Sequence, residues 1–155
     1  MTLKKFRFKL VSMNQKYKLP CINRYREVIM ALIKKDVILV GAKGRKEVTA
    51  LFDSGASYSC IEKRLASELA HLEPLAEPMV FETAERESIV VAEYRVVLDF
   101  FFTDSPRRFT DELVVIEGLS EDIIIGATTM QKWKIRLDFD REEVIYDRKM
   151  QRLRI

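Results

Sequence analysis

The sequence has few of the residues on which metal sites and disulfide frameworks depend. Only two of its 155 residues are cysteines, Cys21 and Cys60, and only one, His71, is a histidine. Two distant cysteines without a histidine cluster form neither a zinc signature nor a disulfide framework. A single histidine also excludes metal sites that are built from several histidines. We therefore predict neither a metal nor a cofactor.

Long apolar segments are also absent. No stretch approaches the roughly 18 consecutive apolar residues that a membrane span needs, so we predict no membrane partner. The first seven residues include two lysines and an arginine where a secretion signal would need an apolar stretch. This pattern predicts a cytoplasmic protein.

Positive charge is concentrated in the first third of the chain. Up to Phe52 there are 13 lysines and arginines against 3 acids, and the remainder has 14 bases against 21 acids. A basic arm of this kind can bind nucleic acid. The sequence offers no interleaved stacking aromatics and no known binding motif, so nucleic acid is the less favoured partner. We favour contact between the basic arm and the acidic remainder of its own chain or of a partner.

Apolar and polar residues alternate in a way that predicts many short strands and few helices. Glycines at 41 and 44 form a turn between two apolar strands, and Ile61, Leu65 and Leu69 recur at helical spacing. The segment 24–35 fits either a helix or a buried strand, and we favour the strand. These features predict a compact, mostly antiparallel β domain. The predicted strands are 4–11, 37–40, 48–52, 79–83, 89–102, 112–116, 122–125, 135–139 and 144–146, and the predicted helices are 59–69 and 127–133.

The most informative feature is an acidic loop directly after the strand 48–52. The loop reads Asp53, Ser54, Gly55, Ala56, Ser57. A carboxylate at a strand end is held by the backbone of a tight loop, and the glycine lets that backbone approach because it has no Cβ. The hydroxyl that follows the aspartate can form a hydrogen bond with a second copy of the same loop.

This loop resembles that of the retropepsin-like aspartic peptidases, in which Asp-Thr-Gly or Asp-Ser-Gly is followed by Ala. A second landmark of that family consists of two apolar residues and a glycine before a short helix. Ile124, Ile125 and Gly126 match it, at 71 to 73 residues after Asp53. The resemblance covers about 37–146 and is stronger to the cellular, prokaryotic or retrotransposon-like members than to the compact viral ones.

The resemblance implies a single-lobe acid-protease β-barrel with one or two short helices. We assign this domain to 36–155 and treat 1–35 as a basic N-terminal extension. It further implies an aspartic endopeptidase that cuts an extended polypeptide by means of two carboxylates sharing one proton. Only Asp53 lies in such a motif, so the second carboxylate has to come from another copy in a twofold homodimer.

The resemblance also implies roles for the other loop residues. Ser54 would bond across the dimer, and Gly55 would offer its carbonyl to the substrate backbone. Ala56 stands where pepsin-type enzymes have a hydroxyl that stabilises the ionised carboxylate, so we predict a less acidic pH optimum than theirs. Ser57 would contact either the substrate main chain or its own loop, and the sequence leaves both possibilities open.

The family also closes a β-hairpin flap over the substrate. We place it at 79–94, with Ala84, Glu85, Arg86 and Glu87 at its tip. No glycine occurs between Gly55 and Gly118, which differs from the family pattern and bears on flap closure. The alternative function is a non-catalytic dimerisation or peptide-binding module of the same fold. The retained Asp-Ser-Gly loop argues against it, because a binding module does not need two buried carboxylates facing each other.

Overall fold

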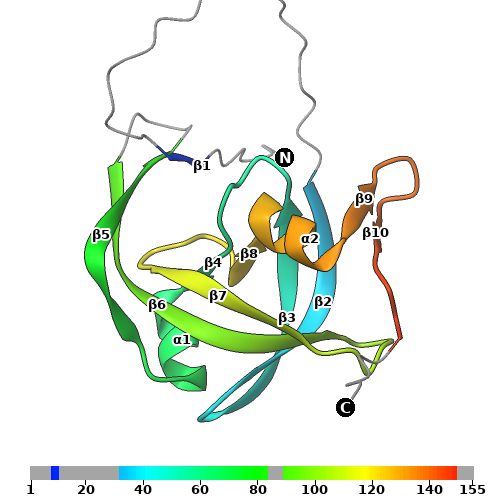
Figure 1. The fold of residues 1–155 in the computed structure, drawn as a ribbon, viewed down its shortest axis with the longest axis horizontal. Helices are drawn as coiled ribbons and strands as arrows, with labels where there is room; N and C mark the ends of the chain where they lie inside the picture. The colour runs from blue at the N-terminus through cyan, green and yellow to red at the C-terminus, as the bar shows by residue number, and fades with distance from the viewer. Residues whose placement is uncertain (1–7, 11–31, 84–88, 150–155) are drawn as a thin grey trace, which may run out of the picture.

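The computed structural model describes residues 8–10, 32–83 and 89–149 (Figure 1). Ten strands and two short helices occur in this part of the chain. In order they are β1 (Phe8–Leu10), β2 (Leu32–Gly41), β3 (Gly44–Asp53), β4 (Cys60–Glu62), α1 (Lys63–Leu69), β5 (Glu73–Thr83), β6 (Ile89–Phe102), β7 (Phe109–Ile116), β8 (Ile123–Ile125), α2 (Ala127–Trp133), β9 (Arg136–Asp138) and β10 (Glu143–Ile145).

Six strands close into a barrel. The larger sheet has the order β1-β5-β6-β2-β3-β8-β4-β7, and an additional pairing of β6 with β7 closes the ring from β6 to β7. Most neighbours are antiparallel, whereas β3 with β8 and β4 with β7 are parallel. Strands β5 and β1 extend the sheet beyond the ring, on the left in Figure 1. The predicted mostly-β barrel with one or two short helices is confirmed.

The hairpin of β2 and β3 carries the start of the acidic loop. Its register runs from Gly41 opposite Gly44 to Leu32 opposite Asp53, so Asp53 is the last residue of a ten-residue strand. Strand β2 begins at Leu32, and the predicted start of the domain at residue 36 therefore falls inside it. Most of the ambiguous segment 24–35 lies outside the described residues.

The predicted helix 59–69 is wrong at its beginning. Residues Cys60–Glu62 form strand β4, because Cys60 and Ile61 pair with β7 on one side and β8 on the other. The helix α1 begins at Lys63, where the Glu62 carboxylate accepts hydrogen bonds from the amides of Arg64 and Leu65. The predicted helix 127–133 is present with the same bounds as α2.

Several strand predictions need correction at their bounds. The predicted strands 37–40, 48–52 and 112–116 are each longer in the structure, as β2, β3 and β7. Strand β5 begins at Glu73, six residues before the predicted start, and its pairing with β6 is irregular between Pro74 and Met79. Strand β9 ends at Asp138, whose carboxylate accepts hydrogen bonds from two amides of the following turn. Phe139 therefore lies in that turn and is 47% exposed instead of half-buried in a strand.

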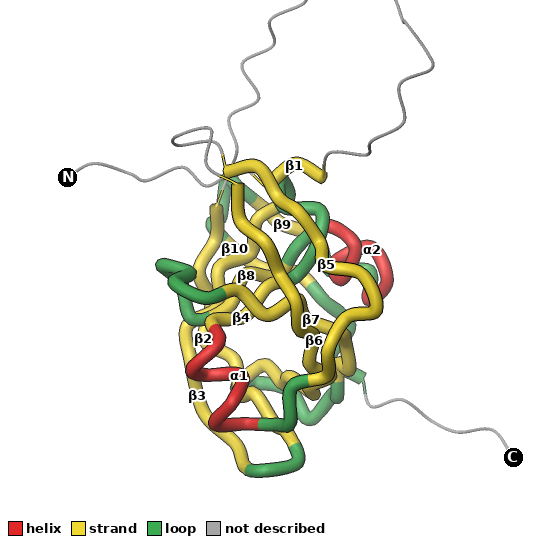
Figure 2. Tube along the Cα trace, turned by 90° about the vertical axis from the view of Figure 1, so that its left-hand side faces the viewer, coloured by secondary structure: helices red, strands yellow, loops and turns green. Residues whose placement is uncertain are grey.

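The core is divided into two clusters. The larger one fills the barrel with aliphatic and aromatic side chains, among which the rings of Phe100 and Phe109 stack at 5.0 Å. The smaller one lies between the acidic loop and the β5–β6 hairpin; its buried members are Leu51, Ala56, Cys60, Phe81, Ala92, Val114, Ile116 and Ile124. Figure 2 shows β5 and β6 running past β4, β7 and β8 on this side. The smaller cluster thus joins the loop to the hairpin.

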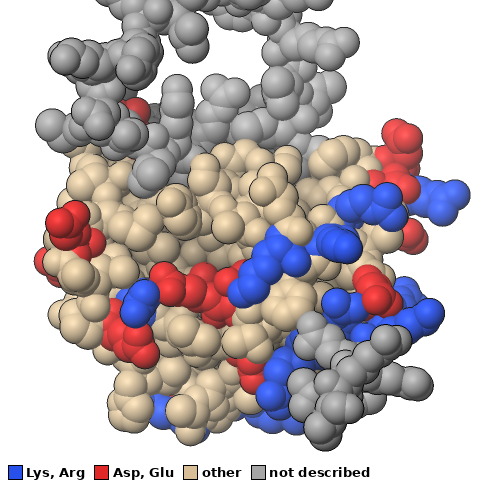
Figure 3. All heavy atoms as spheres, in the orientation of Figure 1, with Lys and Arg blue, Asp and Glu red and all other residues tan. Residues whose placement is uncertain are grey.

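Charges on the surface are unevenly placed. In Figure 3 acidic side chains are prominent on the side of β5 and β6, and basic side chains gather towards the end of the described chain. Exposed acids of the β5–β6 hairpin are Glu73, Glu77, Glu82 and Glu93. Among the described residues, no helix has the length and apolar character needed to cross a membrane.

Candidate active site

Asp53 is fully buried at the end of β3 and is the only buried carboxylate among the described residues. The amide N–H of Gly55 donates to its Oδ1 at 2.7 Å. Its Oδ2 is also buried but has no hydrogen-bond partner in the described chain. One oxygen is therefore held by the loop backbone, and the other has no partner among the residues that the structure describes.

Burial raises the pKa of Asp53 above that of an ordinary aspartate. The amide hydrogen bonds of Gly55 and Ala56 act in the opposite direction, because they stabilise the ionised form, but burial is the larger effect. A proton is therefore held more tightly at this carboxyl group than at a surface aspartate. Such a group can share a proton with another acid or donate one to a ligand.

The loop after Asp53 is a tight turn whose small residues differ in burial. The amide of Ala56 donates to the carbonyl of Asp53 at 3.2 Å, and the Ala56 methyl is fully buried. Ser54 and Ser57 are exposed. The carbonyl of Ser57 accepts hydrogen bonds from the amide of Thr128 at 3.2 Å and from its hydroxyl at 2.7 Å. The backbone of Ser57 is thus bound to α2, whereas Ser54 is a solvent-exposed residue of the loop.

The second landmark lies directly beside this loop. Ile124 and Ile125 pair in parallel with Leu51 and Phe52, so β8 runs alongside the strand that ends at Asp53. A Cβ on Gly126 would lie 2.5 Å from the Tyr58 carbonyl oxygen and 2.8 Å from that of Ala56. The glycine is required at this point because the loop backbone passes too close for any side chain. The fold therefore brings together two segments that are some 70 residues apart.

The hairpin arms of the predicted flap lie over the loop. Strands β5 and β6 pair as far as Glu82 opposite Ile89, and the predicted tip residues Ala84, Glu85, Arg86 and Glu87 lie outside the described residues. Phe81 on β5 is buried and contacts Tyr58 of the loop edge-on, with ring centroids 6.2 Å apart. The end of β5 is therefore packed against the segment that follows Asp53.

Comparison with known families agrees with this geometry. A protein-family model described as aspartyl protease matches residues 38–129, which include Asp53 and the second landmark. The chain belongs to the aspartyl protease family. A search of curated proteins gave no significant match.

The fold of this aspartyl protease chain is similar to a solved structure of the retroviral protease-like domain of Ddi1 from Leishmania major. The TM-score is 0.54 at 20% sequence identity, over 74% of this chain and 90% of that one. At this identity the likeness concerns the fold, and it confirms the predicted retropepsin-like architecture.

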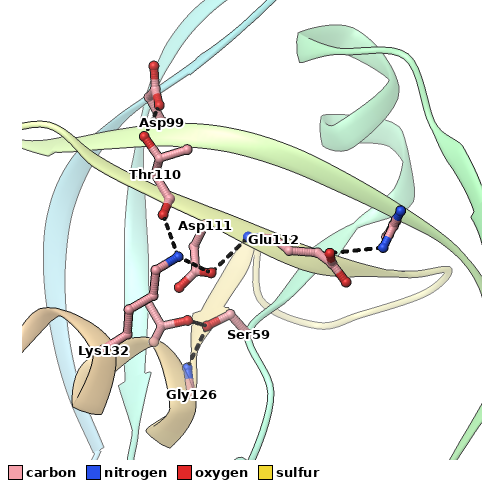
Figure 4. A network of polar contacts seen from close by, with 9 residues as sticks. Ser59, Asp99, Thr110, Asp111, Glu112, Gly126 and Lys132 are labelled. Atoms are coloured by element: carbon pink, nitrogen blue, oxygen red, sulfur yellow. Dashed lines mark hydrogen bonds and ion pairs between the residues drawn. The ribbon is translucent and has the colours of Figure 1, made fainter.

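Two buried hydroxyls join the loop of this aspartyl protease chain to α2, and the sequence did not reveal them. Ser59 Oγ accepts a hydrogen bond from the Gly126 amide at 2.9 Å (Figure 4). The same oxygen forms a second hydrogen bond, of 2.5 Å, with Thr129 Oγ1. Both side chains are 3% exposed or less. A hydroxyl residue in a loop is usually exposed, and no local signal marks two such residues, 70 apart, as partners.

Helix α2 of the aspartyl protease chain is also fixed to β7. The ammonium of Lys132 donates to the Thr110 carbonyl at 3.0 Å and to the Asp111 carboxylate at 3.2 Å (Figure 4). It also lies 5.3 Å from the centre of the Trp133 ring. The loop of Asp53 thus rests on a helix that is itself attached to the barrel.

Other candidate reactive groups lie apart from this chemistry. Cys60 is buried, and burial raises the pKa of its thiol to about 12, so it is not a nucleophile at neutral pH. His71 is exposed just after α1. Cys21 lies outside the described residues. Within the described part of the chain, no group of three or more His, Cys, Asp or Glu side chains is placed to hold a metal.

Proposed function

We propose that the chain is an aspartic endopeptidase that acts as a twofold homodimer, each copy supplying Asp53. This proposal rests on the Oδ2 of a fully buried carboxylate, which has no hydrogen-bond partner within the described part of the chain. Such an oxygen is costly, about 1–3 kcal/mol or more, unless it finds a partner. A second Asp53 across a twofold axis supplies that partner, because two adjacent carboxyl groups share one proton readily.

In the proposed reaction the two carboxyl groups hold one proton and one water. The ionised group takes a proton from the water, whose oxygen bonds to the peptide carbonyl carbon, while the protonated group gives its proton to the carbonyl oxygen. The tetrahedral intermediate collapses when the carboxyl group that took the water proton gives it to the amide nitrogen, the other carboxylate takes a proton from a hydroxyl of the intermediate, and the C–N bond breaks. The pair titrates as a unit, so the two pKa values of the dimer belong to both copies.

The proposed substrate is an extended polypeptide, for which exposed strand edges and loop carbonyls offer main-chain partners. Gly55 is half-buried in the loop, and its carbonyl is the acceptor that we assign to the substrate backbone. Ser54 is exposed and free to meet the second copy. We place the protein in the cytoplasm and propose no nucleic-acid or membrane partner.

The decisive experiment compares the wild-type protein with Asp53→Asn on casein and on a library of peptides. Asp122→Asn is the matched control, because Asp122 is exposed and adjoins β8 without entering the loop. We expect hydrolysis by the wild type and the control, none by Asp53→Asn, and a specific activity that rises with protein concentration as dimers form. Sedimentation over the same concentrations should show the monomer–dimer transition.

Other results would refute the proposal. Equal hydrolysis by the wild type and Asp53→Asn would show that Asp53 is not catalytic. A strictly monomeric and fully active protein would exclude the shared site. Peptide binding without hydrolysis, unchanged in Asp53→Asn, would instead identify a peptide-binding module of the same fold.

A further inference from the structure

Strand β5 has a neighbour on its outer edge. In the sheet order β5 lies beside β6, and its other edge pairs with the three-residue strand β1. The register is antiparallel, with Phe8 opposite Thr83, Lys9 opposite Glu82 and Leu10 opposite Phe81. Residues Phe8–Leu10 therefore pair with the last three residues of β5.

The paired part of β5 is the part nearest Asp53. Phe81 belongs to the same buried cluster as Ala56 of the acidic loop and contacts the ring of Tyr58. Figures 1 and 2 show β1 at the end of β5 that lies on the same side of the barrel as the loop. A strand added to β5 at this point thus lies beside the candidate active site.

A free strand edge in this position is what an extended peptide recognises. Such a peptide gains main-chain hydrogen bonds by adding a strand, and it cannot do so where the edge is already paired. The β5–β6 hairpin also carries the exposed acids Glu73, Glu77, Glu82 and Glu93. Residues 1–31 contain eight lysines and arginines against one acid, and Lys9 stands directly opposite Glu82. The opposite charges of Lys9 and Glu82 therefore favour β1 as the occupant of this edge.

We propose that Phe8–Leu10 is a built-in competitor of the peptide substrate. While β1 is paired, the edge of β5 beside Asp53 is closed to an extended polypeptide, and the chain is held in a self-inhibited form. Displacement of β1 opens the edge. The proposal rests on the proposed function for its effect on activity, whereas occupancy of the edge can be tested without hydrolysis.

Binding is measured in the Asp53→Asn background, with the full chain and a fluorescent peptide that has the sequence of residues 4–11. Lys9→Glu places like charges opposite each other at Glu82 and opens the edge. If β1 covers the edge for nine-tenths of the time, the variant binds the peptide about tenfold more tightly. Lys16→Glu is the matched control, because it changes the charge of the same segment equally but lies outside β1.

Hydrogen exchange gives a second measure of the same pairing. The amides of residues 81–83 should exchange faster in Lys9→Glu, and the charge-swapped pair Lys9→Glu with Glu82→Lys should restore their protection. Unchanged peptide affinity together with unchanged exchange at 81–83 would overturn the proposal, as would an equal effect of Lys16→Glu.

The activity of chains with Asp53 intact separates the two proposals. We expect Lys9→Glu to raise kcat/KM by about the same factor as it raises peptide affinity, mainly through a lower KM. Tighter peptide binding with no hydrolysis in any variant would support the occupied edge and refute the peptidase. Hydrolysis that depends on Asp53 but is indifferent to Lys9→Glu would support the peptidase and refute the competitor.

Discussion

Asp53 is a buried carboxylate whose two oxygens have different surroundings. The amide of Gly55 holds Oδ1, and Oδ2 has no partner within the described chain. Burial dominates and raises the pKa, in the direction of the less acidic optimum that the missing hydroxyl at Ala56 predicts. A pH–rate profile that peaks well below about pH 4, as for pepsin-like dyads, would contradict this expectation.

Asp53→Asn should stabilise the fold at neutral pH. Because the pKa of Asp53 is raised, the folded chain holds more protons than the unfolded chain between the two pKa values, and stability falls as pH rises through this window. Asparagine does not titrate. We expect the variant to be more stable than the wild type by about 1–3 kcal/mol near neutral pH. Below about pH 3.9, the pKa of an aspartate in the unfolded chain, we expect no difference. Urea unfolding across this pH range checks the prediction, and a pH-independent difference would contradict it.

Ser59→Ala should lower activity through the position of the loop. The variant removes the acceptor of the Gly126 amide and the partner of Thr129, which costs about 1–3 kcal/mol of folding free energy. Ser59 positions the acidic loop through Gly126 and Thr129 and is not one of the loop residues that we assign to the substrate. We therefore expect kcat to fall more than KM rises. Kinetics and thermal melting of the same sample measure both effects.

Ser105→Ala is the control for Ser59→Ala. Ser105 is also buried, and its hydroxyl donates to the Arg148 carbonyl and accepts from the Arg107 amide. We expect a similar loss of stability but unchanged kcat at a temperature where the protein remains folded. An equal fall in kcat for both variants would show that Ser59 acts only through stability.

At the scale of elements, the site depends on two short segments with very different neighbours. Strand β8 has three residues and α2 has seven, so neither is stable alone. The first is fixed by pairing with β3 and β4, and the second by hydrogen bonds to the loop and to β7. Their junction at Gly126 has little room for a side chain.

Gly126→Ala should disrupt this junction. The new methyl would lie 2.5 Å from the Tyr58 carbonyl oxygen, so the loop or α2 has to move, at a cost of about 1–3 kcal/mol or more. We expect a lower melting temperature and loss of hydrolysis. Gly44→Ala, in the β2–β3 turn, is the control, because a Cβ there meets no atom within 4 Å. Similar melting temperatures for the two variants would contradict the close approach.

The sequence predicted long elements better than short ones. Alternation over 89–102 marks β6 with its correct bounds, and the acidic loop with its second landmark is visible because family motifs are local. Strand β4 was missed because Ile61 fits helical spacing, while its strand character arises only from distant β7 and β8. The bond between Ser59 and Thr129 was missed for the same reason, since nothing in either segment specifies a partner 70 residues away.

At the scale of the whole molecule, the last described residues pack against the barrel where β6 connects to β7. Tyr146 stacks on Phe102 with centroids 3.7 Å apart, and its hydroxyl donates to the carboxylate of Asp104. Arg148 also pairs with Asp104, and Arg107 pairs with Asp147. These contacts join the chain after β10 to the connection between β6 and β7, where the barrel closes.

Tyr146→Phe should loosen this attachment in a pH-dependent manner. The hydrogen bond from the Tyr146 hydroxyl is the largest cause of the lowered pKa of Asp104. Its contribution to folding stability is therefore present above about pH 3.9, the pKa of an aspartate in the unfolded chain, and is lost as the pH falls through the lower pKa of the folded chain. Since the Asp104 side chain is 40% exposed, we expect only about 0.5–1 kcal/mol at neutral pH. Denaturant unfolding at neutral and acid pH measures it, and a difference that grows towards acid would contradict the assignment.

The parallel pairing of β3 with β8 has a consequence for the order of synthesis. A chain emerging from the ribosome contains Asp53 some 70 residues before the strand and helix that fix its loop. Long-range pairings of this kind form only after both partners are available. A nascent chain therefore has an incomplete loop until Thr129 has emerged, which delays any peptidase activity until this later segment has been made.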